Sequence, residues 1–399
     1  MADISNVVLA AALTWHGALD IAAGRGERGP WQQNESRYDY VDDPTVVIDE
    51  RGEAAVAWVD QGRKDVFFKG VNVSRSPATF SWLPRIALAG DKVLVLWQEI
   101  IFSGGSHGGD ILFARSGDGG KTFSEPLNLS DSVAGDGKGR ITQDLWHNGS
   151  LDLALGADGA VYAAWTEYEG ALWFTRSTDG GRTFHPLLRI NSLQSKPARG
   201  PSLAVGPERT IYLAWTDGDI HVAKSTDGGE TFDPVQVAKN RPYADAPKLA
   251  VDPAGTLHVA YAESNEIRYT RSPDGARSFE RPRALSGRGA GFPHLALDGK
   301  GDVYVAWERL PEARSRPRGL SLTVSRDGGR TFAPPAPVPH SADPSGAPNG
   351  SFQGLLMRKL AVNARGELAI VNSSLKDGER SRVWLMRASP SKRPGPPAS

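Results

Sequence analysis

The sequence predicts an all-β fold, a β-propeller of four-stranded antiparallel blades, from three observations. An eight-residue box of the form Ser-x-Asp-Gly-Gly-x-Thr-Phe recurs five times, once with Ala at its second Gly and Ser at its Thr. In six successive units an aliphatic residue is followed by an aromatic residue eleven or twelve positions later. A strand-like segment lies on each side of the boxes. Four strands per unit, in units that recur every 40–67 residues, are typical of propeller blades.

The boxes are predicted to be hairpins between the third and fourth strands of a blade. Their acidic positions are Asp118, Asp179, Asp227, Asp274 and Asp327. The Asp carboxylate can accept hydrogen bonds from backbone N–H groups ahead of it, and the glycines allow the positive φ angles of a tight turn. A degenerate copy at Ser74–Phe80 belongs to the first unit. We therefore assign the boxes a structural role.

The number of units follows from the pairs of aliphatic and aromatic residues. The six pairs are Val46 and Trp58, Ile86 and Trp97, Leu153 and Trp165, Leu203 and Trp215, Leu249 and Tyr261, and Leu295 and Trp307. A seventh unit, Leu360 to Asn372, keeps the spacing without the aromatic. Seven blades are expected, with six as the alternative if the first unit is only an extension.

Three regions divide the chain. Residues 1–43 form an N-terminal segment, residues 44–388 the propeller, and residues 389–399 a Pro-rich tail expected to be disordered. The last unit stops after its third strand. We expect its fourth strand to come from the N-terminal segment, at residues 5–14 or 36–41, which would close the ring and protect its edges.

Composition removes several classes of function. Lys+Arg and Asp+Glu balance at 46 each, so no global field favours nucleic acid. The absence of cysteine excludes disulfides and thiolate-bound metals. No apolar run is long enough to span a membrane, and Val7–Leu13 lacks the preceding Lys or Arg of an export signal. We expect a monomer without metal, cofactor or membrane span.

Strand direction predicts which face of the propeller carries a site. The loops between second and third strands and those between blades share one face, and the boxes lie on the other. The long insertions 99–110, 131–148, 309–319 and 339–356 all belong to the first kind of loop. Because functional loops gather at one end of a rigid scaffold, this face is the predicted site.

Bases and acids alternate around the predicted channel mouth on that face. The residues directly before the aliphatic positions are Thr45, Arg85, Asp152, Ser202, Lys248, His294 and Lys359. The candidate catalytic residues are Asp43, Asp245, Glu99 and Glu263, because glycoside hydrolysis needs carboxyl groups that face each other. The candidate substrate-binding residues are Arg85, Arg199, Arg358, Trp82, Trp146, His147, His294 and Lys248. In the alternative interpretation, the acids that end the second strands are structural and form salt bridges with the neighbouring blade.

The boxes and their spacing resemble the Asp-box (BNR) repeats of the sialidase superfamily over about residues 44–388. The resemblance implies a propeller directed at glycans and favours an extracytoplasmic or secreted location. Family sialidases carry an Arg-Ile-Pro motif, two further arginines, an Asp acid/base and a Tyr nucleophile paired with Glu. The nearest match to the motif is Arg199-Gly-Pro-Ser-Leu203, in the fourth unit, and Met357-Arg-Lys359 stands where the Tyr is expected. A standard sialidase mechanism is therefore not expected.

Two hypotheses remain open from the sequence. The first is a sialidase-like protein that acts on or recognises acidic glycans, as a glycoside hydrolase or a polysaccharide lyase. The second is a non-catalytic propeller that binds a glycan or a protein partner on the same face.

Overall fold

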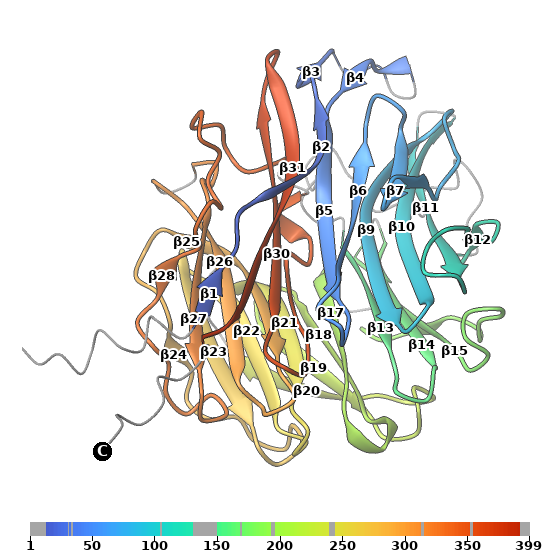
Figure 1. Cartoon of the computed structure of the whole chain (residues 1–399). Coiled ribbons are helices and arrows are strands. Elements are labelled where there is room, and N and C mark those ends of the chain that lie inside the picture. Colours follow the sequence, from blue (N-terminus) through green and yellow to red (C-terminus); the bar gives the residue numbers. More distant parts are fainter. Residues whose placement is uncertain are drawn as a thin grey trace, which may run out of the picture.

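The chain folds into a β-propeller of seven antiparallel sheets, seen from the side in a computed structural model (Figure 1). The structure describes residues 13–30, 32, 35–103, 106–130, 150–167, 170–192, 196–238, 244–312, 315–351 and 354–391. Outside the strands these residues form turns and short 3₁₀ segments, among them η4 (Pro207–Arg209) and η5 (Gly354–Leu356). The predicted fold class and the count of seven blades are confirmed.

Blades 1 to 6 each contain four strands in sequence order. Blade 1 is β5 (Val41–Ile48), β6 (Ala54–Asp60), β7 (Asp65–Phe68) and β8 (Val71–Asn72). Blade 2 is β9 (Phe80–Ala89), β10 (Lys92–Ser103), β11 (Ser106–Ser116) and β12 (Leu127–Asn128). Blade 3 is β13 (Leu151–Leu155), β14 (Val161–Thr166), β15 (Leu172–Ser177) and β16 (Leu188–Arg189).

The remaining blades follow the same plan. Blade 4 is β17 (Arg199–Val205), β18 (Ile211–Thr216), β19 (Ile220–Ser225) and β20 (Asp233–Ala238). Blade 5 is β21 (Ala244–Val251), β22 (Leu257–Glu263), β23 (Glu266–Ser272) and β24 (Arg283–Ala284). Blade 6 is β25 (Ala290–Leu297), β26 (Val303–Arg309), β27 (Leu320–Ser325) and β28 (Ala336–Pro337). Blade 7 contains β29 (Leu360–Val362), β30 (Leu368–Lys376) and β31 (Arg380–Pro390).

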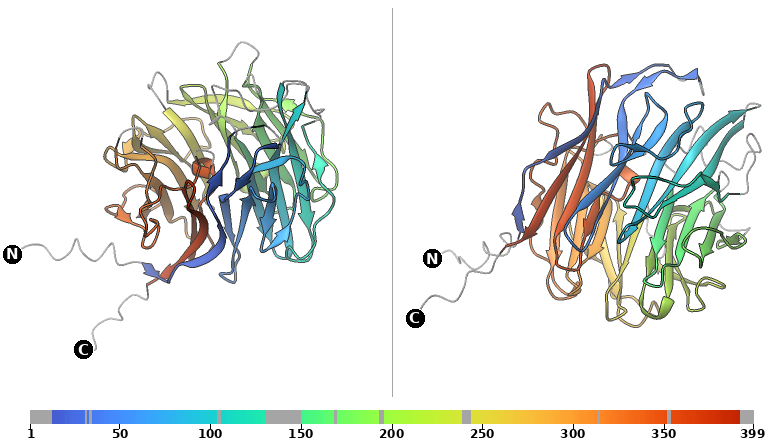
Figure 2. Two further views of the ribbon diagram at one scale, coloured as in Figure 1. Left: turned by 90° about the horizontal axis from the view of Figure 1, so that it is seen from above. Right: turned by 45° about the vertical axis from the view of Figure 1, so that its right-hand side comes forward.

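The first strand of every blade contacts the first strands of both neighbours, and β29 contacts β5. These seven strands therefore surround a central space (Figure 2). The apolar side chains pack between blades: Leu96 and Phe113 of blade 2 lie in one cluster with Leu153 and Trp165 of blade 3. The aromatic residue predicted at the end of each second strand belongs to this core, which holds neighbouring blades together.

Five first strands begin with a β-bulge at an X-Pro pair. The residue before proline has a positive φ at Asp43, Leu83, Gly200, Ala246 and Phe292. The ladder with the second strand shifts register at each of these places. These strands begin before their prolines. Downstream of each bulge, alternate side chains face the centre of the ring, and upstream of it this register is no longer kept.

The two faces carry the elements expected of them. In blade 2, the Gly119 N–H of the box donates to Asp91 O at 2.8 Å, so the box lies beside the hairpin between the first and second strands. On the opposite face the long loops 309–319 and 339–356 meet, where the Asn349 N–H donates to Pro317 O at 2.8 Å. The hairpin between β30 and β31 rises on this face, at the top of Figure 1.

The outer edge of blade 7 is covered by the N-terminal segment. β1 (Leu13–Trp15) and β2 (Leu19–Gly24) both pair antiparallel with β31. Of the predicted positions, 5–12 lie outside the described residues. Residues 38–39 instead form β4 (Tyr38–Asp39), which pairs with β3 (Glu27–Arg28). That an N-terminal strand closes the ring stays a prediction.

Two boundaries differ from the sequence analysis. The degenerate box is not the turn of blade 1, because β7 and β8 are joined by Lys69 and Gly70, with φ of 47° and 83°. Two positive φ angles in succession are typical of a type I′ hairpin. Ser74 instead donates to the Asp65 carboxylate at 2.6 Å. At the other end, β31 extends to Pro390, beyond the boundary placed before residue 389.

Candidate functional site

The Asp boxes form a rim in which the polar groups have partners. In blade 4, Asp227 accepts from the Ser225 hydroxyl at 2.7 Å, from the Glu230 N–H at 2.9 Å and from the Thr231 hydroxyl at 2.6 Å. The hydrogen bonds from Thr231 and Ser225 hold the pKa of Asp227 well below its usual range. The Ser225 hydroxyl oxygen also accepts the buried Gly229 N–H at 2.8 Å. The boxes thus stabilise their own turns, as predicted.

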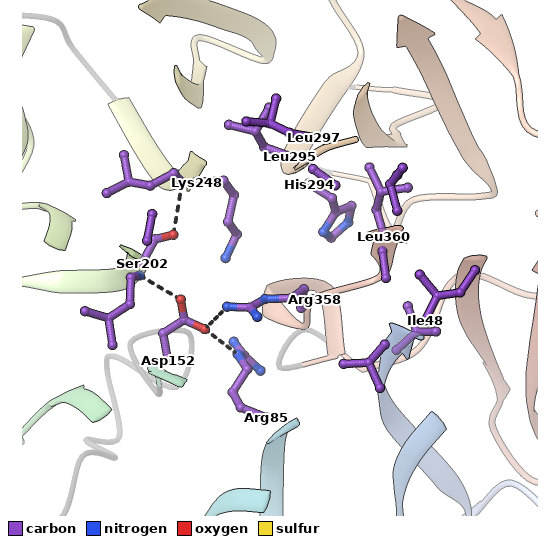
Figure 3. Close-up of a pocket in the computed structure, with 18 of the residues that line it drawn as sticks. Ile48, Arg85, Asp152, Ser202, Lys248, His294, Leu295, Leu297, Arg358 and Leu360 are labelled. Carbon is purple, nitrogen blue, oxygen red and sulfur yellow. Dashed lines mark hydrogen bonds and ion pairs between the residues drawn. The ribbon is translucent and has the colours of Figure 1, made fainter. Parts of the chain in front are cut away.

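A cavity of about 330 Å³ occupies the centre of the ring. Its polar layer is built from one residue on each of five first strands and one on the segment before β29: Arg85, Asp152, Ser202, Lys248, His294 and Arg358. These side chains converge in Figure 3. The other half of the wall is apolar and includes Ile48, Leu88, Leu297 and Val362. One end of the cavity is therefore charged and the other apolar.

Asp152 is the carboxylate of this layer, and two arginines hold it. Its Oδ1 lies 2.7 Å from Arg358 Nη2 and 3.5 Å from Arg85 Nε, and its Oδ2 accepts the Leu203 N–H at 2.8 Å (Figure 3). Each carboxylate oxygen therefore has a donor. Asp152 fixes the arginines, and it is not a free acid or base.

The two arginines differ in how many of their guanidinium N–H groups already have acceptors. Arg85 is buried and donates to Leu356 O at 2.8 Å, to Pro84 O at 3.2 Å and to Met357 Sδ at 3.1 Å. Burial lowers the pKa of Arg85 to about 10, so the guanidinium stays charged. The Arg358 side chain is 35% exposed, and its contacts within the described residues use Nη2 alone. Arg358 therefore presents one edge of its guanidinium to the cavity.

Lys248 and His294 have fewer contacts than the other polar residues of the layer. No described residue lies within hydrogen-bonding or ion-pair distance of Lys248 Nζ, and burial, followed by the charge of Arg85, lowers its pKa to about 8. Both ring nitrogens of His294 are buried without a hydrogen bond among the described residues, and Nε2 lies 4.0 Å from a carboxylate oxygen of Glu308. Burial lowers the pKa of His294 to about 4, which leaves the ring neutral. A buried polar group without a hydrogen bond costs about 1–3 kcal/mol, so the His294 ring makes this cavity the candidate site.

The candidate catalytic carboxylates do not line this cavity. Asp43 is fully buried, where it accepts the Leu83 N–H at 3.1 Å and the Ser351 hydroxyl at 3.4 Å. Burial and the neighbouring Asp42 raise the pKa of Asp43 to about 8, so it is protonated at neutral pH. Glu99 is buried and accepts the Ser81 hydroxyl and the Trp97 indole N–H, and burial raises its pKa to about 7.

The other two candidate acids also lie away from the cavity lining. Asp245 accepts the N–H of Ala246, and Glu263 pairs with Arg268 at 3.0 Å. The predicted salt bridges to the neighbouring blade are seen for Glu308, which lies 2.6 Å from Lys359 Nζ. Glu263 instead pairs within its own blade. The structural interpretation of these acids thus fits their contacts better than a catalytic one.

Among the candidate substrate-binding residues, Arg85, Arg358, Lys248 and His294 are brought together. Arg199 is absent from the cavity lining, and Trp82 packs against Phe80, Leu83 and Met357. Trp146 and His147 lie outside the described residues. Asp152 and Ser202 also line the cavity, although neither was among the candidate ligand-binding residues. Their position directly before the aliphatic residue of each pair was the available signal.

The cavity is covered on the face predicted to carry the site. There Leu355 and Leu356 of η5 and the following Met357 are buried, and Arg85 donates to this segment (Figure 2). At the opposite end the wall residues Ile48, Leu88 and Leu297 are partly exposed. Within the described residues, exposure of the wall therefore increases toward the Asp-box face.

The described residues contain no group of three or more His, Cys, Asp or Glu side chains that could hold a metal ion. In the described part of the chain, no helix has the length and apolar character needed to cross a membrane.

Several solved structures share this architecture. A protein of unknown function from Dyadobacter fermentans aligns over 94% of this chain and 100% of its own, with a TM-score of 0.53 and 12% identity. The NanB sialidase of Streptococcus pneumoniae aligns over 78% of this chain and 68% of its own, at 0.52 and 11%. The α-L-arabinofuranosidase Arb93A of Fusarium graminearum aligns over 79% and 94%, at 0.51 and 15%. At such identities the likeness shows the fold alone.

No curated protein sequence matches the chain. Residues 61–305, more than half of the chain, match the BNR repeat-like domain. The Asp boxes at the rim, the seven-bladed ring and this match agree, and the chain belongs to the family of BNR repeat-like domains, with a sialidase-like propeller.

Proposed function

We propose that the protein recognises acidic glycans, and that the carboxylate of one sugar residue binds in the central cavity against Arg358. The observation that carries this proposal is the convergence of unpaired polar groups. The edge of Arg358 that Asp152 does not occupy, Lys248 Nζ and the His294 ring share one cavity, and the buried Nδ1 of His294 has no hydrogen bond among the described residues. A planar carboxylate matches the two parallel N–H groups of a guanidinium edge.

The charge of the polar layer supports an anionic ligand. Arg85 and Arg358 are positive, and Lys248 is positive below its pKa of about 8, whereas Asp152 is the one negative group. Lys359 and Glu308 neutralise each other behind the wall. The layer thus holds excess positive charge in a partly enclosed cavity, which favours a ligand carboxylate.

The shape of the cavity suits a sugar residue. Its volume of about 330 Å³ falls at the small end of the range for small-molecule sites, roughly 300–1,000 Å³. The apolar wall beyond the polar layer can contact the C–H groups of a pyranose ring. Lys248 and His294 remain for its hydroxyl groups.

Isothermal titration calorimetry with galacturonate, glucuronate and N-acetylneuraminate, against glucose and galactose, tests the proposal. We expect at least one acidic sugar to bind and the neutral sugars not to bind. Arg358→Ala should weaken binding by about 10- to 100-fold, as expected for loss of charged hydrogen bonds. Arg199→Ala, which alters an arginine outside the cavity, is the matched control. Equal affinity in the two variants, or no binding of any acidic sugar, would contradict the proposal.

A further inference from the structure

The cavity contains the groups for one reaction and lacks those for another. Hydrolysis of a glycosidic bond by the usual route needs two carboxyl groups, one as acid and one as base or nucleophile. Among the described residues that line the cavity, Asp152 is the one carboxylate, and both of its oxygens have donors. Asp43, Glu99, Asp245 and Glu263 lie elsewhere. The arrangement therefore does not favour hydrolysis.

An amine without a partner stands beside the proposed carboxylate site. Lys248 extends from β21 into the cavity and ends near Arg358 and Asp152 in Figure 3. A lysine is a useful general base when burial and neighbouring cations bring its pKa close to 7–8. The groups that face Lys248 from the surrounding strands are Arg85, Asp152, Arg358, Asp245 and His294. Burial, together with the charges of Arg85 and Arg358, outweighs the attraction of Asp152 and Asp245, so the neutral amine is accessible near neutral pH.

We propose that the protein cleaves 4-linked uronate glycans by β-elimination, with Lys248 as the base and Arg358 as the group that neutralises the uronate carboxylate. This inference rests on the proposed function, because the same carboxylate must first bind in the cavity. A carboxylate held by a guanidinium makes the adjacent C5–H more acidic, since the charge that develops on the carboxylate in the transition state is stabilised.

The step balances without an oxidant or added water. Lys248 Nζ takes the proton from C5, and the C5–H electron pair becomes the C4=C5 double bond. The C4–O bond breaks, and its electron pair leaves on the oxygen of the departing sugar. The proton held by Lys248 then passes to that oxygen, which regenerates the amine. The products are a 4,5-unsaturated uronate and a shortened saccharide.

His294 has a separate role in this arrangement. Its ring is neutral, its Nε2 lies 4.0 Å from Glu308, and its Nδ1 has no hydrogen bond among the described residues. Nδ1 can hydrogen-bond a sugar hydroxyl, which would orient C5 toward Lys248. His294 is thus a binding residue and not the base.

The test is a set of 4-linked uronate polysaccharides and oligosaccharides, assayed for the ultraviolet absorbance of the unsaturated product. The wild-type protein should form this product, and kcat/KM should rise with pH toward about 8 and then level off, because the base must be neutral in the free protein. Lys248→Met should lower kcat at least 1,000-fold, roughly the upper part of the range for general-base loss, and this loss should far exceed the decrease in sugar affinity. Lys121→Met, an exposed lysine in an Asp box, is the control.

Each outcome decides between the two proposals. Unsaturated product that is lost in Lys248→Met, with binding retained, supports β-elimination. Saturated products with new reducing ends would overturn it in favour of hydrolysis. Binding of uronates without turnover would overturn the elimination and keep the proposed function. Failure to bind any uronate would overturn both. If Lys248→Met fails to fold, Lys248→Gln and Lys248→Arg are measured in its place, with uronate binding as the check on folding.

Discussion

The rim and the centre of this propeller repeat with the same period but differ in how their polar groups are satisfied. In the boxes of blades 2 to 6, the Asp carboxylate accepts hydrogen bonds from its own turn. In the central layer, both ring nitrogens of His294 are buried and make no hydrogen bond among the described residues. Paired groups stabilise a fold, whereas unpaired buried groups cost stability unless a ligand completes them.

The same contrast extends to residue identity. The box keeps nearly the same residues in five blades, because the same turn is needed in each. The position that faces the cavity holds a different residue in each of five successive blades: Arg85, Asp152, Ser202, Lys248 and His294. The repeated residues therefore form the scaffold, and the candidate site is formed by residues that differ from blade to blade. Changes at the rim should affect stability, and changes at the centre should affect ligand binding.

The largest expected effect at the rim is that of Gly329→Ala. Gly329 has a φ of 81°, and an added Cβ would lie 2.7 Å from Tyr269 Cζ, and closer still to the hydroxyl. Strain and overpacking together should lower the free energy of unfolding by about 3 kcal/mol or more. Denaturant unfolding measures the loss. Ala276, at the equivalent position of blade 5, already has a φ of 68°, so Ala276→Gly should change stability by less than about 1 kcal/mol. Similar losses in both variants would show that the clash with Tyr269 is unimportant.

Ser225→Ala should have the next largest effect. It removes the hydrogen bond to Asp227 and leaves the buried Gly229 N–H without its acceptor. The free energy of unfolding should fall by about 2 kcal/mol, within the range for an unsatisfied buried donor. Uronate affinity should not change. A change in uronate affinity without a change in the free energy of unfolding would contradict the distinction between rim and centre.

The sequence predicted the rim better than the centre, for a physical reason. Turn chemistry is local, so Asp-Gly-Gly alone identifies the hairpins. The register of the repeat also predicted that Arg85, Lys248 and His294, each directly before the aliphatic residue of its unit, face the central channel, and all three line the cavity. Arg199 was misplaced because the bulge at Gly200 and Pro201 changes the register upstream of Ser202. The burial of Asp43 could not be predicted, because Ser351, which contacts it, lies more than 300 residues away in the chain.

Asp43→Asn should have the smallest of the three effects on the free energy of unfolding. It changes a buried carboxyl group at the boundary of the central site. Asp43 has a folded pKa of about 8, above that of the unfolded chain, so the folded state binds a proton that the unfolded state releases. Wild-type stability should therefore fall as pH rises from about 4 to about 8. Asn keeps the acceptor for the Leu83 N–H and does not titrate, so its stability should decline by about 1 kcal/mol less than that of the wild type between pH 6.5 and 7.5. Parallel pH profiles for the two proteins would show that Asp43 is ionised in the fold.

A crystal structure with a bound uronate tests the central claim most directly. We predict the sugar in the central cavity, with its carboxylate against the free edge of Arg358 and its C5 facing Lys248 Nζ. Another cavity lies at the outer edge of blades 2 and 3, beside Trp173 and His185. A uronate found there, with the central cavity unoccupied, would contradict the account.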